Sequence, residues 1–481
     1  MMWNFKQHSE NTAAITECGE VISYQQLDEA GVAFTQNINS RCLVFSLCTN
    51  SIGALVGYTG LINNNQVPLL LDASIDLESL NKLIDIYRPA YLWMPDVIAS
   101  YFTGFCTVFS DWRYVLLKTS FNEHYPLFDD LALLLTTSGS TGSPKLVRLS
   151  INNLKANALS IAEYLQLDSS ERPITTLPMS YSYGLSIINS HLAVGATLLM
   201  TTSTLMEKNF WSFLKEQKAT SFGGVPYTYE ILNKLRFFRM GLDSLRTMTQ
   251  AGGKLSLELH QKFSEYAHSA GKRFFVMYGQ TEATARMAYL PSEKSIEKRG
   301  SMGIAIPGGK LSLIDVEGKE VCEPLVTGEL VYSGQNVSMG YAESGEDLIK
   351  GDELQGQLFT GDMAQRDEEG YFYIVGRKKR FLKIFGNRIN LDETESMIKS
   401  FYQNIECACA GVDDKMYIFV AESSCVENIR KFVSDKTGLN QVAFKVVIVD
   451  AIPKNESGKI SYIALERMIT ERVESTGERY A

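Results

Sequence analysis

The stretch 136–145, TTSGSTGSPK, directly follows the apolar run 131–135, LALLL. The apolar run is typical of a buried strand, and the small residues after it close that strand in a turn. Glycines let the backbone approach a phosphate closely, while amides and hydroxyls offer hydrogen-bond donors and Lys145 offers a positive charge. A Walker A loop is excluded, because two residues separate the second glycine from the lysine. The sequence therefore predicts a phosphate-binding loop of a different kind at the end of a strand.

Strands and helices alternate on the C-terminal side of this stretch. Residues 151–167 place apolar side chains at helical spacing behind Ser150, which predicts a helix capped by that serine. Further strands are predicted at 173–177, 196–201, 221–225 and 274–277, and further helices at 185–194, 207–218 and 227–238. The alternation predicts an α/β fold with largely parallel sheets and ligands near the carboxyl ends of strands.

The pattern changes after about residue 300, where KLSLID, GELVYS and GYFYIVG alternate like antiparallel strands and predict a small β-barrel-like part. The basic run RKKRFLK at 377–383 then precedes a segment with its own apolar stretches. We expect a large domain over 1–378, built of α/β subdomains, and a smaller α+β domain over 379–481. Lys378 and Arg380 are interpreted as part of a solvated face.

The amino-acid composition limits which classes of protein the chain can belong to. The chain has 481 residues, and its 45% hydrophobic and 21% charged content is typical of a folded protein. The net charge is −9, from 46 basic against 55 acidic residues, which argues against nucleic-acid binding. We expect neither a signal peptide nor a membrane span. The eight cysteines lack metal-ligand spacing, so buried free thiols and a cytoplasmic location are expected.

Four further motifs follow the 136–145 stretch in order: YGQTE at 278–282, FTGD at 359–362, GRKK at 376–379 and PKNESGKI at 453–460. Together the five motifs resemble the signatures of the adenylate-forming superfamily, over roughly residues 20–465. That superfamily includes acyl-CoA synthetases, the adenylation domains of peptide synthetases and luciferase-like ligases.

The resemblance implies that a carboxylic acid attacks ATP to form an acyl-adenylate and pyrophosphate, after which the acyl group passes to a thiol. It implies that Glu282 binds Mg²⁺ and that Thr281 donates to the α-phosphate. It further implies that Tyr278 stacks on adenine and that Asp362 and Arg377 bind the ribose. Plainer interpretations stay open, such as a core aromatic, a helix-start charge or a turn residue.

The small domain carries the other implied catalytic residues. Lys459 would bridge the α-phosphate and the acid, so the domain, expected to be mobile, must close before the first step. Lys379 matches the hinge, Lys383 a residue used in one of two domain conformations, and Arg388 a position near the phosphates. The further residues implied for nucleotide binding are Thr137, Ser138, Gly139, Ser140, Thr141, Gly142, Lys145, Gly252, Gly253, Gly279 and Gln280.

The stretch 177–199, LPMSYSYGLSIINSHLAVGATLL, is similar to the acyl-pocket helix of the superfamily. Ser182 stands where amino-acid-adenylating domains carry an aspartate that pairs with the ammonium, so an α-amino acid is disfavoured. Tyr181 stands where many acyl-CoA and aryl-CoA ligases carry a histidine, and His191 is interpreted as a packed or surface residue. The expected pocket residues are Tyr181, Ser182, Gly184, Gly224, Val225 and Ala251. Small residues there leave room for a ligand, although Gly223 and Gly224 could instead serve close packing.

The acceptor thiol is left open by the sequence. Coenzyme A and the phosphopantetheine arm of a separate carrier protein present the same thiol, and coenzyme A is favoured slightly. The implied partners are thus ATP, Mg²⁺, a small carboxylic acid and one of these thiols. A non-catalytic nucleotide-binding protein with the same fold is the alternative from another class, and nothing points specifically to luciferase-like oxidation.

Overall fold

The computed structural model describes residues 2–121, 125–136, 145–378, 380–385, 387–402, 405–421, 426–454 and 460–476. The chain divides into two compact units. The first comprises Met1–Leu311 and Tyr332–Leu358, and the second Ser312–Val331 and Phe359–Ala481. The second unit thus takes in segments that the sequence assigned to the larger domain, and the hinge at Lys379 stays a prediction. Within the described ranges, the chain has no helix long and apolar enough to cross a membrane.

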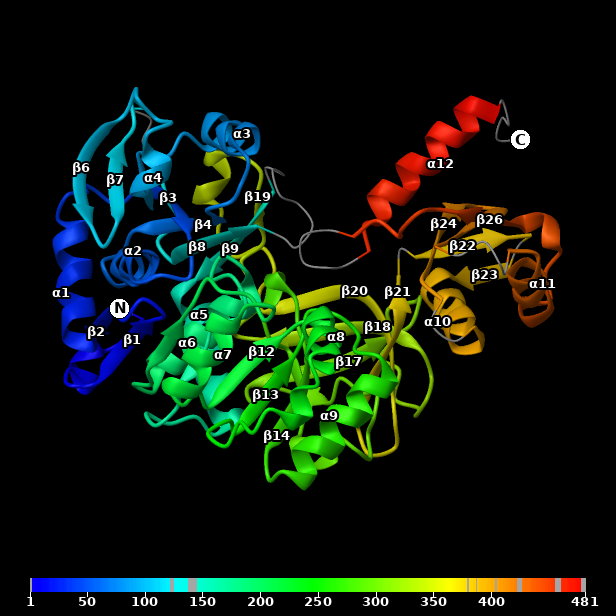
Figure 1. Ribbon diagram of the computed structural model, residues 1–481. Coiled ribbons are helices and arrows are strands. Elements are labelled where there is room, and N and C mark those ends of the chain that lie inside the picture. The colour runs from blue at the N-terminus through cyan, green and yellow to red at the C-terminus, as the bar shows by residue number, and fades with distance from the viewer. Residues whose placement is uncertain are drawn as a thin grey trace. The chain divides into compact units, whose positions relative to one another are not determined.

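The first unit contains two large sheets that carry the sequence-predicted alternation (Figure 1). The eight-stranded sheet runs in the order β19 (Tyr341–Ala342), β9 (Leu146–Ser150), β8 (Leu131–Thr136), β4 (Val67–Asp72), β3 (Leu43–Cys48), β5 (Tyr91–Pro95), β7 (Tyr114–Lys118), β6 (Cys106–Asp111). The nine-stranded sheet runs in the order β16 (Ile304–Ala305), β15 (Ala288–Leu290), β14 (Arg273–Tyr278), β13 (Thr247–Gln250), β12 (Ser221–Gly224), β10 (Pro173–Ile174), β11 (Leu198–Met200), β1 (Thr12–Thr16), β2 (Val21–Ser23). The neighbours from β14 across to β1 are parallel, as the alternation predicts.

Helices cover these sheets and supply the core. They are α1 (Tyr24–Thr35), α2 (Ile52–Asn63), α3 (Leu77–Tyr87), α4 (Asp96–Ala99), α5 (Ile151–Leu165), α6 (Ser182–Ala193), α7 (Lys208–Glu216), α8 (Pro226–Lys234) and α9 (Leu257–Ser269). Strand β3 is buried on both faces. Its Val44 joins one apolar cluster, whereas Phe45 joins another, because successive strand residues point to opposite faces. The sheet is therefore a central layer, as in α/β folds.

Local sequence explains where α5 begins. Ser150 Oγ accepts the amide of Asn153 at 3.1 Å, and Asn153 Oδ1 accepts the amide of Ser150 at 2.8 Å. These reciprocal bonds satisfy two amides that the first helical turn would leave unpaired. The predicted cap is confirmed, and Figure 1 shows that α5 and α6 pack side by side.

The second unit contains smaller antiparallel and mixed sheets. Strands β17 (Gly309–Ile314), β18 (Gly328–Gly334), β20 (Gln357–Arg366) and β21 (Phe372–Arg377) form a four-stranded sheet in the part expected to be barrel-like, and the boundaries of the unit fall within β17, β18 and β20. A hairpin β22 (Phe381–Ile384) and β23 (Asn387–Asn390) precedes a three-stranded sheet of β24 (Cys407–Val412), β25 (Lys415–Val420) and β26 (Phe444–Ile448). Its helices are α10 (Leu391–Phe401), α11 (Val426–Thr437) and α12 (Tyr462–Thr476). The predicted α/β fold class is confirmed.

The cysteines only partly match the expectation of buried thiols. Cys42, Cys48, Cys407 and Cys409 are buried and free. Cys18, Cys106 and Cys322 are also free but exposed, so the expectation of burial is wrong for them. Cys18 lies in a turn, Cys106 begins the edge strand β6 and Cys322 lies in a loop, and residue spacing alone does not indicate these places.

Candidate active site

The motif YGQTE lies where strand β14 ends and the short helix η3 (Thr281–Ala283) begins. The side chain of Gln280 donates to Tyr278 Oη at 3.2 Å. A Cβ on Gly279 would lie 1.6 Å from the carbonyl oxygen of Ala285, so only glycine lets the chain fold back here. The predicted loop therefore sits at the carboxyl end of a parallel strand, where α/β folds bind ligands.

Three segments of the chain bring together the carboxylate of Glu282, the phenol of Tyr341 and the ammonium of Lys145. Tyr341 Oη donates to Glu282 Oε1 at 2.9 Å, and Lys145 Nζ lies 3.9 Å from the centroid of the Tyr341 ring. Tyr341 pairs with Val147 in the β19–β9 register, which carries Lys145 next to it. Burial first, and the Glu282 charge second, raise the pKa of Tyr341, so the phenol stays a donor at neutral pH.

Sequence reasoning missed Tyr341 altogether. It stands 59 positions from Glu282. The surrounding segment is bonded to the motif a second time, because the amide of Ser338 donates to the carbonyl of Glu282 at 2.8 Å. The string SMGY at 338–341 gives no residue-type signal for this contact.

The first residue of α6 reaches the same loop. Ser182 Oγ lies 3.1 Å from Thr281 Oγ1, and both residues are buried. The structure thus joins one residue predicted for the acid pocket to one predicted for the α-phosphate. Ser182 opens α6, where backbone amides point outward, and the Thr281 hydroxyl beside it adds a second donor, so the arrangement suits an anionic group.

The predicted pocket wall is more closely packed than the small residues suggest. A Cβ on Gly252, whose φ is +84°, would lie 2.8 Å from Tyr181 Oη and 3.1 Å from Val225 Cγ1. A Cβ on Gly223 would lie 2.7 Å from Ile187 Cδ1 and 3.0 Å from Tyr183 Oη. Side chains of the chain itself therefore occupy the space beside these glycines.

The remaining predicted wall residues are also close to the chain. A Cβ on Gly224 would lie 2.6 Å from Thr228 Cγ2, one on Gly184 would lie 2.3 Å from the Pro178 carbonyl oxygen, and one on Gly253 would lie 3.1 Å from Pro226 Cγ. Ala251 is buried. At Gly223 and Gly224 the structure favours the close-packing interpretation.

His191 is buried near the end of α6, as the packed interpretation expects. Its Nδ1 lies 2.8 Å from the Ile187 carbonyl oxygen, while Nε2 has no hydrogen-bond partner within the described ranges. Burial first, and the charge of Arg286 among the further causes, lowers the pKa of His191 to about 4, so the imidazole is neutral at pH 7.

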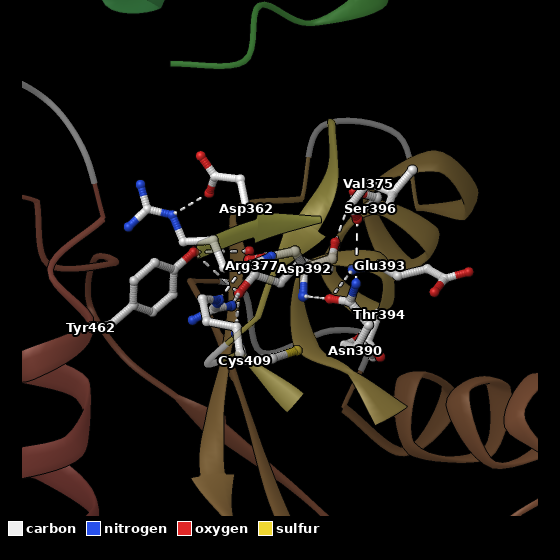
Figure 2. Close-up of polar contacts among 12 residues, drawn as sticks. Asp362, Val375, Arg377, Asn390, Asp392, Glu393, Thr394, Ser396, Cys409 and Tyr462 are labelled. Atoms are coloured by element: carbon white, nitrogen blue, oxygen red, sulfur yellow. Dashed lines mark hydrogen bonds and ion pairs between the residues drawn. The ribbon is translucent and has the colours of Figure 1, made fainter. Parts of the chain in front are cut away.

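Asp362 and Arg377 face each other in the second unit. They are partners in the β20–β21 register, and Arg377 Nε lies 3.2 Å from Asp362 Oδ1 (Figure 2). The Asp362 side chain is 7% exposed, whereas that of Arg377 is 66% exposed. The pair is thus a buried acceptor beside a cation that is largely free to contact solvent or a ligand.

Arg380 corrects the interpretation of the basic run. Its side chain is 12% exposed and forms ion pairs with Asp392 and Glu395, and its guanidinium carbon lies 3.5 Å from the centroid of the Tyr462 ring. Figure 2 shows Tyr462 and Asp392 turned toward this cluster. The solvated-face interpretation is wrong for Arg380, because two carboxylates one helical turn apart on α10 draw it inward. It holds for Lys378, which is 54% exposed and pairs with Glu329.

Several predicted residues fall outside the described part of the chain. They are Thr137, Ser138, Gly139, Ser140, Thr141, Gly142, Lys379 and Lys459. Lys383 and Arg388 are paired in the β22–β23 register, but their side chains are likewise outside the description.

Comparison with known proteins gives consistent matches. A family model described as AMP-binding enzyme matches residues 3–342, more than half of the chain. The chain is 29% identical to oxalate–CoA ligase of Arabidopsis thaliana, over 69% of this chain and 66% of that protein. It is 27% identical to luciferin 4-monooxygenase of Nipponoluciola cruciata, over 72% of this chain and 65% of that protein. The matches thus span slightly less than two thirds of these relatives' own lengths.

Solved structures show the same fold. The o-succinylbenzoate CoA synthetase of Bacillus subtilis, in complex with its acyl-adenylate intermediate, superposes with a TM-score of 0.76 at 20% identity. The alignment covers 96% of this chain and 97% of that one. ATP-bound MatB of Rhodopseudomonas palustris gives 0.75 at 22% identity, over 96% and 98% of the two chains.

Proposed function

The chain belongs to the AMP-binding enzyme family, and from this premise we propose that it is an AMP-forming ligase that joins a carboxylic acid to a thiol. In the first step, an oxygen of the acid bonds to the α-phosphorus of ATP while the bond to pyrophosphate breaks. In the second, the thiol sulfur bonds to the acyl carbon, AMP leaves and the thiol proton is released. We favour coenzyme A as the thiol, and the matches to CoA ligases support this choice.

The observation that carries the proposal is the cluster of Ser182, Thr281, Glu282, Tyr341 and Lys145. It offers hydroxyl donors, one oriented carboxylate and one cation at the end of a parallel strand. Phosphoryl chemistry is catalysed mainly by positioning and by stabilising charge, and these groups are of the required kinds.

The donor set also fits Mg²⁺. Magnesium is usually held through one or two carboxylates, waters and substrate phosphates. Tyr341 fixes one Glu282 oxygen, and in the described ranges no three His, Cys, Asp or Glu side chains gather into a protein-only metal cage. When bound, Mg²⁺ would supply positive charge beside the phosphates, with Glu282 as its protein ligand.

Other roles stay proposals carried by the motifs. We propose that Tyr278 stacks on adenine, that Asp362 and Arg377 bind the ribose hydroxyls, and that Lys459 neutralises charge between acid and α-phosphate. Buried Asp362 is a suitable acceptor for hydroxyl donors.

The test is acid-dependent exchange of labelled pyrophosphate into ATP, screened over short, fatty, aryl, hydroxy and dicarboxylic acids. The proposal expects exchange with at least one acid, and mass spectrometry should then detect that acid's CoA thioester. Exchange without a CoA thioester would favour a separate carrier protein. AMP binding without exchange for any acid would favour a non-catalytic nucleotide-binding protein and overturn the proposal.

Lys459→Ala separates the two steps. Because Lys459 is proposed to act only when acid meets ATP, the variant should lose on the order of 100-fold or more in exchange. Thioester formation from supplied acyl-adenylate should be largely retained. Equal losses in both reactions would contradict the assigned role.

A further inference from the structure

Arg286 is a wholly buried arginine four residues beyond Glu282. It is 1% exposed, and two asparagine side chains hold its backbone carbonyl: Asn157 Nδ2 at 2.9 Å and Asn336 Nδ2 at 3.0 Å. The backbone at this position is thus fixed from two sides, and the side chain extends from a rigid point.

The guanidinium is poorly satisfied. Nη1 donates to Tyr164 Oη at 3.0 Å and to Met277 Sδ at 2.7 Å, a weak acceptor, and Nε has no hydrogen-bond partner in the part of the chain that the structure describes. The guanidinium carbon lies 4.6 Å from the centroid of the Tyr183 ring. Among the described residues, no carboxylate forms an ion pair with Arg286.

A buried cation without a counter-ion is costly, because burial removes water and no opposite charge compensates for the loss. The same unit shows that the chain can satisfy a buried arginine fully. Arg148, which is 0% exposed, donates to the Glu353 carboxylate and to the carbonyls of Met339, Tyr341 and Lys350. The missing anion at Arg286 therefore calls for an explanation.

The position of Arg286 supplies one. Tyr183, on which the guanidinium rests, lies in α6 between Ser182 and Gly184, and Ser182 contacts Thr281. The cation is thus one side chain removed from the cluster proposed to bind the reacting acid. Side chains of α6 lie against Gly223, and the side chains of Tyr181 and Val225 lie against Gly252.

We propose that Arg286 binds a second carboxylate of the substrate, and that the acid activated by this protein is a short dicarboxylic acid. The inference rests on the proposed ligase function and deepens it. One carboxylate meets ATP, while the other accepts hydrogen bonds from the buried guanidinium. Arg286 would then determine specificity without touching the reacting atoms.

The experiment compares acids of matched length that differ in the distal group: succinate, butyrate and 3-hydroxybutyrate. In wild-type pyrophosphate exchange, succinate should exceed butyrate in kcat/KM by about 30-fold or more, the usual effect of a buried charge pair. Arg286→Gln should lower kcat/KM for succinate by a similar factor and bring the ratio of the two acids toward one. Arg246→Gln, at a half-exposed arginine of the same unit, is the matched control and should keep the wild-type ratio.

Thermal shift provides a readout that does not depend on catalysis. Succinate should raise the Tm of the wild type and of Arg246→Gln, but not that of Arg286→Gln, and butyrate should raise none. A wild type without preference between succinate and butyrate overturns the inference, as does a preference for 3-hydroxybutyrate. If Arg286→Gln does not fold, two other results test the inference. One is the preference of the wild type for succinate over butyrate, and the other is that Arg286→Lys should keep part of this preference. Absence of exchange with every acid overturns the proposed function itself, which is a separate outcome.

Discussion

Two arginines are buried to the same degree in the first unit, yet their surroundings differ completely. Arg148, in the middle of strand β9, is surrounded by three carbonyls and a carboxylate. Arg286, beside the candidate site, has a phenol, a thioether and an aromatic face, and one of its nitrogens has no hydrogen-bond partner among the described residues. Removing a buried cation that is fully paired leaves its partners unsatisfied, whereas a buried cation that lacks an anion is better explained by a ligand. The comparison thus distinguishes an arginine that holds the fold together from one that we propose binds a ligand.

The largest expected effect is on stability. Arg148→Met should lower the free energy of unfolding by about 3–5 kcal/mol, because it removes the arginine donor from three carbonyls and a carboxylate. Arg286→Met should change it by no more than about 1 kcal/mol, since a methionine removes an uncompensated charge. All four tryptophans lie in the first unit, at positions 3, 93, 112 and 211, so urea unfolding followed by tryptophan fluorescence reports on it. Equal losses for both variants would break the comparison.

The sequence predicts features that depend on neighbouring residues, but it does not predict contacts between segments that are far apart in the chain. The helix after Ser150 and the strand before YGQTE follow from capping and apolar runs, and both are observed. The pairing of Tyr341 with Glu282 and the burial of Arg286 depend on segments far apart in the chain, so residue type gave no warning. Arg380 was misjudged for the same reason, because its carboxylate partners stand 12 and 15 positions later.

The pH dependence of stability tests the neighbourhood of Arg286. Burial lowers the pKa of His191 from its ordinary 6.5 to about 4, so the folded protein resists protonation of this imidazole. The stability contribution is complete above pH 6.5 and is lost as the pH falls toward 4, by at most about 3 kcal/mol. His191→Gln should remove this part of the slope in urea midpoints measured from pH 7 to 4. His260, whose pKa burial also lowers to about 4, remains as an internal background in both proteins.

His191 also reports on the charge of Arg286, which contributes to the lowered pKa. In Arg286→Gln the pKa of His191, followed by NMR of the imidazole, should rise toward its ordinary value without reaching it, because burial is the larger cause. An unchanged pKa would show that the two side chains do not interact, and would weaken the assignment of an uncompensated charge to this core.

A matched pair of tyrosines extends the comparison to carboxylates. Tyr341 donates to Glu282, and Tyr462 donates to Glu395, at 3.2 Å to Oε2. Glu395 also binds Arg380 and the amide of Cys409, whereas no ion pair of Glu282 occurs among the described residues. Tyr341→Phe should therefore have the larger effect, a loss of about 10- to 100-fold in kcat/KM for Mg²⁺–ATP, as expected when a charged group loses its hydrogen bond. Exchange measured at varied ATP and Mg²⁺ checks it, and an unchanged kcat/KM would remove Glu282 from the proposed metal site.

The smallest effect is expected at Tyr462, because its partner Glu395 has other hydrogen-bond donors. Burial, followed by the Glu395 charge, raises the pKa of Tyr462, so it is a protonated donor at neutral pH. Tyr462→Phe removes only one of the donors on Glu395, and the ring beneath Arg380 is retained, so the second unit should lose about 0.5–1.5 kcal/mol. Hydrogen exchange of the Cys409 amide, which donates to Glu395 Oε1 at 2.7 Å, should accelerate by roughly 2- to 10-fold. A far larger acceleration would mean that Arg380 cannot hold Glu395 without the phenol. The presence of carboxylate partners would then not distinguish Arg380 and Arg148 from Arg286, which has none among the described residues.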